Sequence, residues 1–203
     1  RDRLRSRGLG DVYKRQGSYF DGLARMNKQT GTCQDATSLL QGNLNAGKPK
    51  VSCIIEDKNK NLWVGTYGSG LYKINLPTQH VTYYESTRNE NDDWSINRLP
   101  NDWISYLLED KEGMIWIGTY KGLAVLNPQT DNFINYKKQN NLLPGYVVYS
   151  LLESSNGEIW AGTSEGLVCL NKDRLTPVLF TTADGLPSDI ICGLAEDEKK
   201  NIW

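Results

Sequence analysis

Short segments in which apolar and polar residues alternate recur along the chain, and clusters of turn-forming residues separate them. The pattern is clearest in one stretch, which has strand-like segments at 106–109, 114–119, 122–127 and 132–136. The residues between these segments, such as 110–113, are the Asp, Lys and Gly combinations typical of turns. A sustained 3.6-residue helical period is absent from the sequence. The pattern therefore predicts an all-β protein made of groups of four short antiparallel strands.

One phrase, an apolar residue followed by Trp, a small or apolar residue, Gly and Thr, repeats at 62–66, 115–119 and 159–163, and a fourth copy begins at 202–203. The spacings between successive Trp residues are 53, 44 and 43 positions. Four strands at this period are typical of a β-propeller blade. We expect about four blades of a partial propeller, divided into 17–50 (the outer part of a blade), 51–100, 101–143, 144–182 and 183–203 (the start of the next blade).

The residues that recur in each repeat have structural interpretations. We expect the Trp of the second strand to fill the space between blades. We expect the Gly two positions after the Trp to allow close approach of the next sheet. A Glu stands seven positions before each Trp, and we expect it to cap the first hairpin of the blade together with the Asp that follows it. Because these residues recur in every blade, we interpret them as architecture rather than as catalytic groups. They are Trp63, Trp116, Trp160 and Trp203; Gly65, Gly118 and Gly162; Glu56, Glu109, Glu153 and Glu196; and Asp57, Asp110 and Asp197, with Ser154 replacing the Asp in one copy.

The first sixteen residues differ from the rest of the chain. Residues 1–16 contain six Lys or Arg and two Asp, without strand alternation and without the apolar core of a signal peptide. At the repeat position of the Trp they carry Arg15. We interpret this segment as a non-native scar derived from cloning or an adapter, with a basic arm as the alternative.

Composition narrows the possible functions. Hydrophobic residues make up 38% of the 203, enough for a core, and no apolar run approaches the length of a membrane span. The net charge of −1 argues against binding of nucleic acid. His80 is the only histidine, which excludes a two-histidine metal site, so we expect no metal and no cofactor. The four cysteines lack a C-x-x-C spacing, which favours free thiols.

With these residues in view, the chain resembles the two-component regulator propeller repeat. The resemblance depends on phrases such as 152–167, which contains Ile159-Trp160-Ala161-Gly162-Thr163, and on the blade entry Asp184-Gly185-Leu186-Pro187. It implies a seven-bladed propeller outside the cytoplasmic membrane, in the sensor region of a Bacteroidetes hybrid histidine kinase that responds to polysaccharide breakdown products. The chain would then be a non-catalytic, periplasmic sensor fragment. The implied partners are the remaining blades, downstream signalling domains, an oligosaccharide and, in the full-length protein, a second copy in a homodimer.

Candidate ligand-binding residues lie in the loops at one end of the blades. The segment 85–103 accounts for the longest Trp spacing and holds two Trp outside the repeat register, with two Arg nearby. Sugars are bound by aromatic faces flanked by planar polar groups, although both Trp could simply anchor a long loop. Two Tyr at equivalent turns between the second and third strands are further candidates. The six residues are Trp94, Trp103, Arg88, Arg98, Tyr67 and Tyr120.

Two other functional classes stay open at the level of the sequence. A propeller lyase or glycosidase would use loop carboxylates as acid and base, but no isolated carboxylate pair stands out in the sequence. A scaffold propeller that binds other proteins would show the same repeats.

Overall fold

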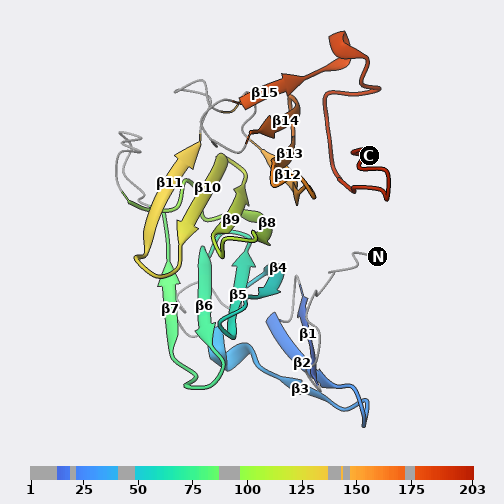
Figure 1. The fold of residues 1–203 in the computed structure, drawn as a ribbon. Helices are drawn as coiled ribbons and strands as arrows, with labels where there is room; N and C mark the ends of the chain where they lie inside the picture. The colour runs from blue at the N-terminus through green and yellow to red at the C-terminus, as the bar shows by residue number, and fades with distance from the viewer. Residues whose placement is uncertain are drawn as a thin grey trace.

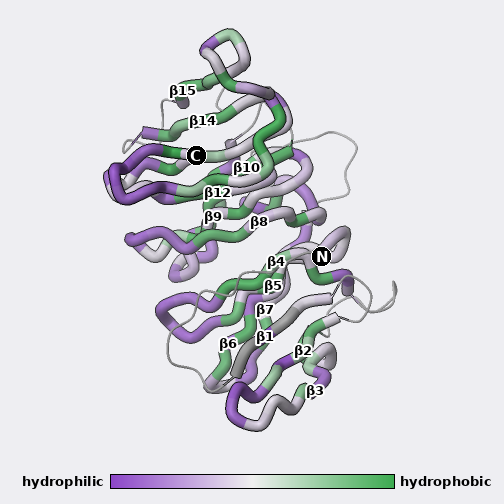
Figure 2. Tube along the Cα trace, turned by 90° about the vertical axis from the view of Figure 1, so that its right-hand side faces the viewer, coloured by the Kyte–Doolittle hydropathy of each residue, from purple (hydrophilic) through white to green (hydrophobic). Residues whose placement is uncertain are grey.

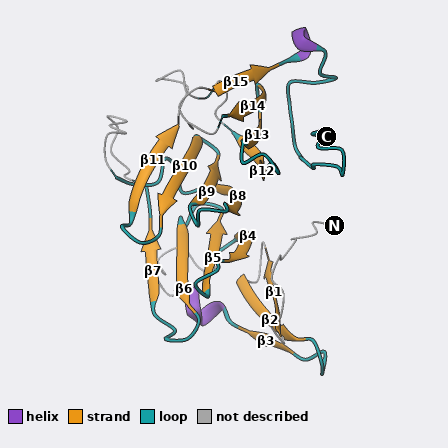
Figure 3. Ribbon diagram, in the orientation of Figure 1, coloured by secondary structure: helices purple, strands orange, loops and turns teal. Residues whose placement is uncertain are grey.

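The computed structural model describes residues 13–18, 22–40, 49–86, 97–136, 143, 147–171 and 177–203. Its strands form four antiparallel sheets (Figures 1 and 3). The first contains β1 (Tyr13–Ser18), β2 (Gly22–Asn27) and β3 (Cys33–Asp35); the second β4 (Val51–Glu56), β5 (Asn61–Thr66), β6 (Leu71–Asn75) and β7 (Val81–Tyr84); the third β8 (Ile104–Glu109), β9 (Ile115–Thr119), β10 (Gly122–Asn127) and β11 (Asn132–Tyr136); the fourth β12 (Val148–Glu153), β13 (Ile159–Thr163), β14 (Gly166–Leu170) and β15 (Pro177–Phe180). Two 3-10 turns, η1 (Thr37–Leu40) and η4 (Thr182–Asp184), are the helical elements among these residues.

Each sheet follows the order of the chain, so that every strand pairs with its sequence neighbour. The first strands of the complete sheets, β4, β8 and β12, lie against one another, while β7 and β11 lie at the opposite side of the stack (Figure 1). Hydrophobic residues run along the strands, and hydrophilic residues gather in the turns (Figure 2). The predicted all-β architecture of four-stranded propeller blades is confirmed. None of the described residues belongs to a helix that is long and apolar enough to span a membrane.

The two ends of the described chain form incomplete blades. The first sheet has three strands, and β1 begins at Tyr13, before the boundary at 16/17 that the sequence suggested. Residues 13–18 pair with β2 in unbroken register, from Tyr13 opposite Asn27 to Ser18 opposite Gly22. The origin of residues 1–16 stays a prediction, but the sheet itself extends into that segment. At the other end, Glu196 pairs with Ile202 as the first hairpin of a further blade.

The space between sheets is filled as the repeat predicted. Trp63 and Trp116 are fully buried, each within an apolar cluster that spans two successive sheets. Close approach explains the recurring Gly, since a Cβ at Gly65 would lie 2.7 Å from Ile104 Cγ2 of the next blade. Trp203 differs from the expectation because it is 74% exposed, with no sheet packed over it among the described residues.

The Trp of each complete blade also stacks on an aromatic ring at the end of the fourth strand of the same blade. The ring centroids are 5.8 to 6.1 Å apart and the planes are tilted by 20° to 26°, as in offset stacking. The pairs are Trp63 with Tyr84, Trp116 with Tyr136, and Trp160 with Phe180. This second aromatic stands 14 positions after the Gly at the start of the third strand in each of the three complete blades.

Three of the four recurring Glu join blades, so the expectation that they cap their own hairpins is wrong for these three. Glu56 pairs with Lys60 of its own hairpin and with Arg15 of β1. The carboxylate of Glu109 accepts from the backbone N–H of Lys58, in the first turn of the preceding blade, at 3.2 Å. Glu153 accepts in the same way from the N–H of Lys111 at 3.0 Å, and Glu196 accepts from the N–H of Ser155 at 2.8 Å. A carboxylate reaches across to the neighbouring turn because that turn presents backbone donors without partners in its own sheet.

The Asp after the Glu does cap the hairpin, and it also holds the Trp. Asp57 accepts at Oδ1 from the N–H of Asn61 at 2.8 Å and at Oδ2 from Nε1 of Trp63 at 2.8 Å. Asp110 makes the equivalent bond to Trp116 Nε1 at 2.8 Å. The fourth blade has Ser154 instead, whose shorter side chain accepts from the N–H of Glu158. The buried Nε1 of Trp160 consequently has no partner among the described residues.

Candidate functional site

The position just before the innermost strand of a blade faces the turn between the second and third strands. In the second, third and fourth sheets, the carbonyl at this position accepts from the first N–H of that turn. The donor and acceptor pairs are Tyr67 to Lys50 at 2.9 Å, Tyr120 to Trp103 at 3.1 Å, and Ser164 to Val147 at 3.0 Å. Trp103 therefore occupies a defined repeat position, at which the neighbouring blades carry Lys50 and Val147. This geometry places its ring among the turn residues of two blades.

Three of the candidate residues meet in an aromatic cluster, which we define as Tyr67, Trp103 and Tyr120. The centroid distances are 6.2 Å for Tyr67 to Trp103, 6.1 Å for Tyr67 to Tyr120 and 5.5 Å for Trp103 to Tyr120. All three pairs are edge-to-face, with interplanar angles of 65° to 78°. Trp103 is 50% exposed and Tyr120 is 37% exposed. The cluster thus presents ring surface to solvent while each ring is supported by the other two.

The backbone beneath the cluster is held by Asp102. Its carbonyl accepts from the N–H groups of Gly68 and Gly70 at 3.0 and 3.1 Å, and its carboxylate accepts from the N–H and hydroxyl of Ser86 at 2.6 and 2.8 Å. Asn101 Oδ1 also accepts from the N–H of Trp103 at 3.0 Å. These bonds join the long loop to the turn of the preceding blade, so the indole of Trp103 is carried by a fixed backbone.

The remaining candidates do not all lie at this cluster. Trp94 and Arg88 fall outside the described residues. Arg98 is exposed, and its carbonyl accepts from Nδ2 of Asn135 at 3.1 Å, which places it beside the outermost strand β11. The last part of the loop therefore runs along the outer edge of the third blade before it turns inward to Trp103.

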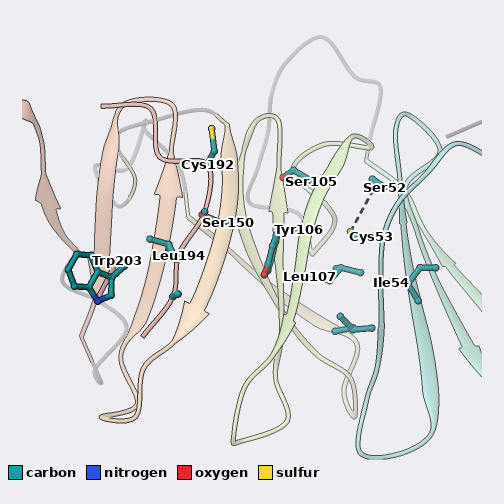
Figure 4. A pocket seen from close by; sticks show the side chains of 13 residues that line it. Ser52, Cys53, Ile54, Ser105, Tyr106, Leu107, Ser150, Cys192, Leu194 and Trp203 are labelled. Carbon is teal, nitrogen blue, oxygen red and sulfur yellow. Dashed lines mark hydrogen bonds between the residues drawn. The ribbon is translucent and has the colours of Figure 1, made fainter. Parts of the chain in front are cut away.

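A cavity of about 520 Å³ lies along the innermost strands, and we call it the axial cavity (Figure 4). Its walls come from β4, β8 and β12 and from residues 192–195. No side chain of the lining carries a charge. The lining consists of aliphatic side chains, Gly193, and side chains with hydroxyl, thiol or indole groups. The hydroxyl-bearing residues are Ser52, Ser105, Tyr106 and Ser150, and the thiols are Cys53 and Cys192.

A β-bulge lies in each of the three strands that line the axial cavity. The register shifts at the same place in three sheets, between Val51 and Cys53, between Ile104 and Tyr106, and between Val148 and Ser150. A bulge bends a strand and redirects the side chains on either side of it, and bulges occur often beside functional sites. Ser52 and Ser105, the extra residues of the first two bulges, both line the cavity.

The polar groups of the cavity are only partly satisfied. The hydroxyl of Ser105 donates to the carbonyl of Val148 in the next blade, and the hydroxyl of Ser52 lies 3.6 Å from Sγ of Cys53. Ser150 is 3% exposed, and its hydroxyl has no hydrogen-bond partner within the described ranges. Burial raises the pKa of the Cys53 thiol to about 12, which keeps it protonated and unreactive at neutral pH.

The axial cavity was not predicted from the sequence, although the sequence carries a signal for it. The recurring Glu gives a register for the innermost strands, and the residues three and four positions before it differ from blade to blade. A comparison of those positions would have separated variable residues from architectural ones.

A metal site is typically formed by several His, Cys, Asp or Glu side chains close together. The described residues contain no group of three or more such side chains placed to hold a metal ion. His80 is exposed beside the start of β7, and all four cysteines are free, as the sequence favoured for the thiols. The cluster and the cavity instead supply aromatic faces and uncharged hydrogen-bonding groups, which suit reversible binding.

Comparison with known proteins agrees with this architecture. The profile of the two-component regulator propeller matches residues 47–68, 98–121 and 142–165. No curated protein matches the sequence. Among solved structures, the chain is similar to the extracellular domain of a putative hybrid two-component system from Bacteroides thetaiotaomicron, with 25% identity and a TM-score of 0.76 over 93% of this chain and 24% of that one.

Two further solved structures share the fold. A second extracellular domain of a putative hybrid two-component system from the same organism has 23% identity and a TM-score of 0.74, over 98% of this chain and 25% of that one. Virginiamycin B lyase from Staphylococcus aureus has 12% identity and a TM-score of 0.63, over 94% of this chain and 61% of that one. The chain thus spans about a quarter of the length of the two-component domains. With the blades, the recurring Trp and the three matched segments in agreement, this chain carries repeats of the two-component regulator propeller family.

Proposed function

We propose that the chain is part of an extracytoplasmic sensor and that it binds a carbohydrate through the aromatic cluster without transforming it. The observation that carries this proposal is the half-exposed Trp103, supported edge-to-face by Tyr67 and Tyr120 on a fixed backbone. Such a ring is costly to leave in water, and a sugar face that covers it removes apolar surface from solvent.

The similarity to extracellular domains of hybrid two-component systems supports a sensing role. In this proposal the propeller lies in the periplasm as one part of a longer, membrane-anchored and dimeric protein. Occupation of the loop face would alter how the blades contact the remaining domains, and a kinase elsewhere in the protein would read that change.

Isothermal titration calorimetry of the 203-residue chain with a panel of oligosaccharides tests the binding step. Trp103→Ala should raise the Kd of a binding sugar by about tenfold or more, as for a central aromatic contact. Ile134→Ala is the matched control, because Ile134 is 55% exposed on the outer strand β11 and removes a similar apolar contact far from the cluster.

The proposal is contradicted if no sugar of the panel binds, or if Trp103→Ala and Ile134→Ala bind with the same affinity as the unaltered chain. Product analysis of the same mixtures tests the non-catalytic part. Cleavage of the bound sugar at a rate that depends on Trp103 would make the chain an enzyme.

A further inference from the structure

We infer that the carbohydrate held by the aromatic cluster is uncharged and that it extends from the cluster into the axial cavity. This inference rests on the proposed function and adds to it the chemical class of the ligand and the second half of its site.

The cluster and the cavity share a strand. Trp103 lies just before β8, and Ser105 and Tyr106 of β8 line the cavity. Two residues of strand span about 7 Å, so the exposed indole and the first hydroxyl of the cavity are near neighbours. The bulge between Ile104 and Tyr106 lies at this junction and redirects the side chains there. A ligand longer than one sugar ring can therefore contact both.

Residues at equivalent positions of the innermost strands differ from blade to blade where they line the axial cavity. Two positions before the recurring Glu, the strands β4, β8 and β12 and the segment 192–195 keep a large aliphatic residue, as a shared core requires. Three and four positions before it, they vary between hydroxyl, thiol, aromatic and Gly. The aliphatic residues are Ile54, Leu107, Leu151 and Leu194, and the variable ones are Ser52, Ser105, Tyr149 and Cys192, with Cys53, Tyr106, Ser150 and Gly193. Seven of the eight variable residues line the cavity. Residues with a purely structural role in a repeat are expected to be similar in every copy, so this variation points to a ligand-binding role.

The lining of the cavity selects against charge. None of its residues is acidic or basic. A carboxylate or sulfate placed there would lose hydration without gaining an ionic partner, which is strongly unfavourable. A hydroxyl group, in contrast, can both donate to and accept from the buried and unpartnered hydroxyl of Ser150. The phenol of Tyr106, which is 37% exposed, offers a second such group. These contacts favour a neutral, hydroxyl-rich ligand over a uronic or sulfated one.

Protection of Cys192 from alkylation tests the path into the cavity. Cys192 lines the cavity and is exposed, whereas Cys33 is exposed on β3, outside the cavity lining. Burial raises the pKa of Cys53 to about 12 and that of Cys169 to about 11, so both react slowly with iodoacetamide. The rate at each cysteine is followed by peptide mass spectrometry, with neutral hexasaccharides such as xylohexaose, mannohexaose and galactohexaose as probes and hexagalacturonate as the charged probe.

With a neutral hexasaccharide that binds, at ten times its Kd, we expect alkylation of Cys192 to slow by about tenfold while that of Cys33 is unchanged. Hexagalacturonate should leave both rates unchanged. Binding that is lost in Trp103→Ala but does not protect Cys192 would overturn this inference and leave the proposed function intact. Equal protection by hexagalacturonate would overturn the assignment of a neutral ligand. Failure of every sugar to bind would refute the proposed function itself.

Discussion

Replacing Ser154 by Asp should stabilise the protein, because it restores a hydrogen bond that the equivalent Asp makes in three other repeats. Asp57 and Asp110 each accept from the Nε1 of their Trp at 2.8 Å, while the buried Nε1 of Trp160 has no such partner. A buried N–H without a partner costs about 1–3 kcal/mol. The new carboxylate would also accept from the N–H of Glu158, as Asp110 accepts from Met114, which offsets its loss of hydration.

We therefore expect Ser154→Asp to raise the free energy of unfolding by about 1–2 kcal/mol. For a chain of this size that corresponds to an increase in Tm of about 2–8 °C. Urea unfolding followed by circular dichroism measures the first quantity, and a thermal melt measures the second. Ser154→Asn is a useful companion, since its amide oxygen can accept from Trp160 without bringing a charge.

A double-mutant cycle with Trp160→Phe isolates the bond. In that background the indole N–H is gone, so Ser154→Asp should give no stabilisation, or a loss caused by the buried carboxylate. If Ser154→Asp changes the stability equally in both backgrounds, or destabilises the chain that retains Trp160, the role assigned to the Asp and Trp pair is wrong.

Four further substitutions test the packing of the blades and the titration of the recurring Glu. Trp63→Ala should cost about 3–5 kcal/mol in urea unfolding, whereas Trp103→Ala, at a half-exposed ring, should cost no more than about 2 kcal/mol; equal losses would contradict the separation of core from site. Gly65→Ala should destabilise by more than about 2 kcal/mol because the new methyl group would meet Ile104, and an unchanged midpoint would argue against the close approach. Burial raises the pKa of the Glu109 carboxyl, so the native state binds the carboxyl proton more tightly than the unfolded chain does. The free energy of unfolding should therefore fall as the pH rises from about 4.5. Glu109→Gln should remove this loss. If plots of the free energy of unfolding against pH for the unaltered chain and for Glu109→Gln stay parallel from pH 4 to 7, the role given to Glu109 is refuted.

Much of the fold was predictable because the same pattern of strands and turns recurs in several copies of the repeat. Strand boundaries, the turn signals and the buried positions of Trp63 and Trp116 follow from alternation and spacing alone. The role of Glu109 did not follow, because a sequence shows that a carboxylate recurs and not which neighbouring turn its oxygen atoms reach. That contact depends on the offset between blades, which is a property of the assembled stack.

The site was predictable in part for a similar reason. Tyr67 and Tyr120 were placed correctly on one face because equivalent turns must lie side by side, and Trp103 joined them because it precedes an innermost strand. Arg98 was grouped with them by its nearness in sequence, yet a six-residue segment of extended chain covers about 20 Å, enough to reach the outer strand instead. The axial cavity arises from residues more than 40 positions apart, so it becomes visible in sequence only after the blades are aligned on their Glu.

Hydrogen–deuterium exchange with a bound neutral oligosaccharide tests the central claim most directly, namely that constant residues build the blades while variable residues at one face bind the ligand. We predict slower exchange at 67–70, 101–107 and 118–121, with no change at the opposite turns 57–61 and 110–114. Protection confined to those opposite turns, or spread evenly over all five segments, would contradict the account.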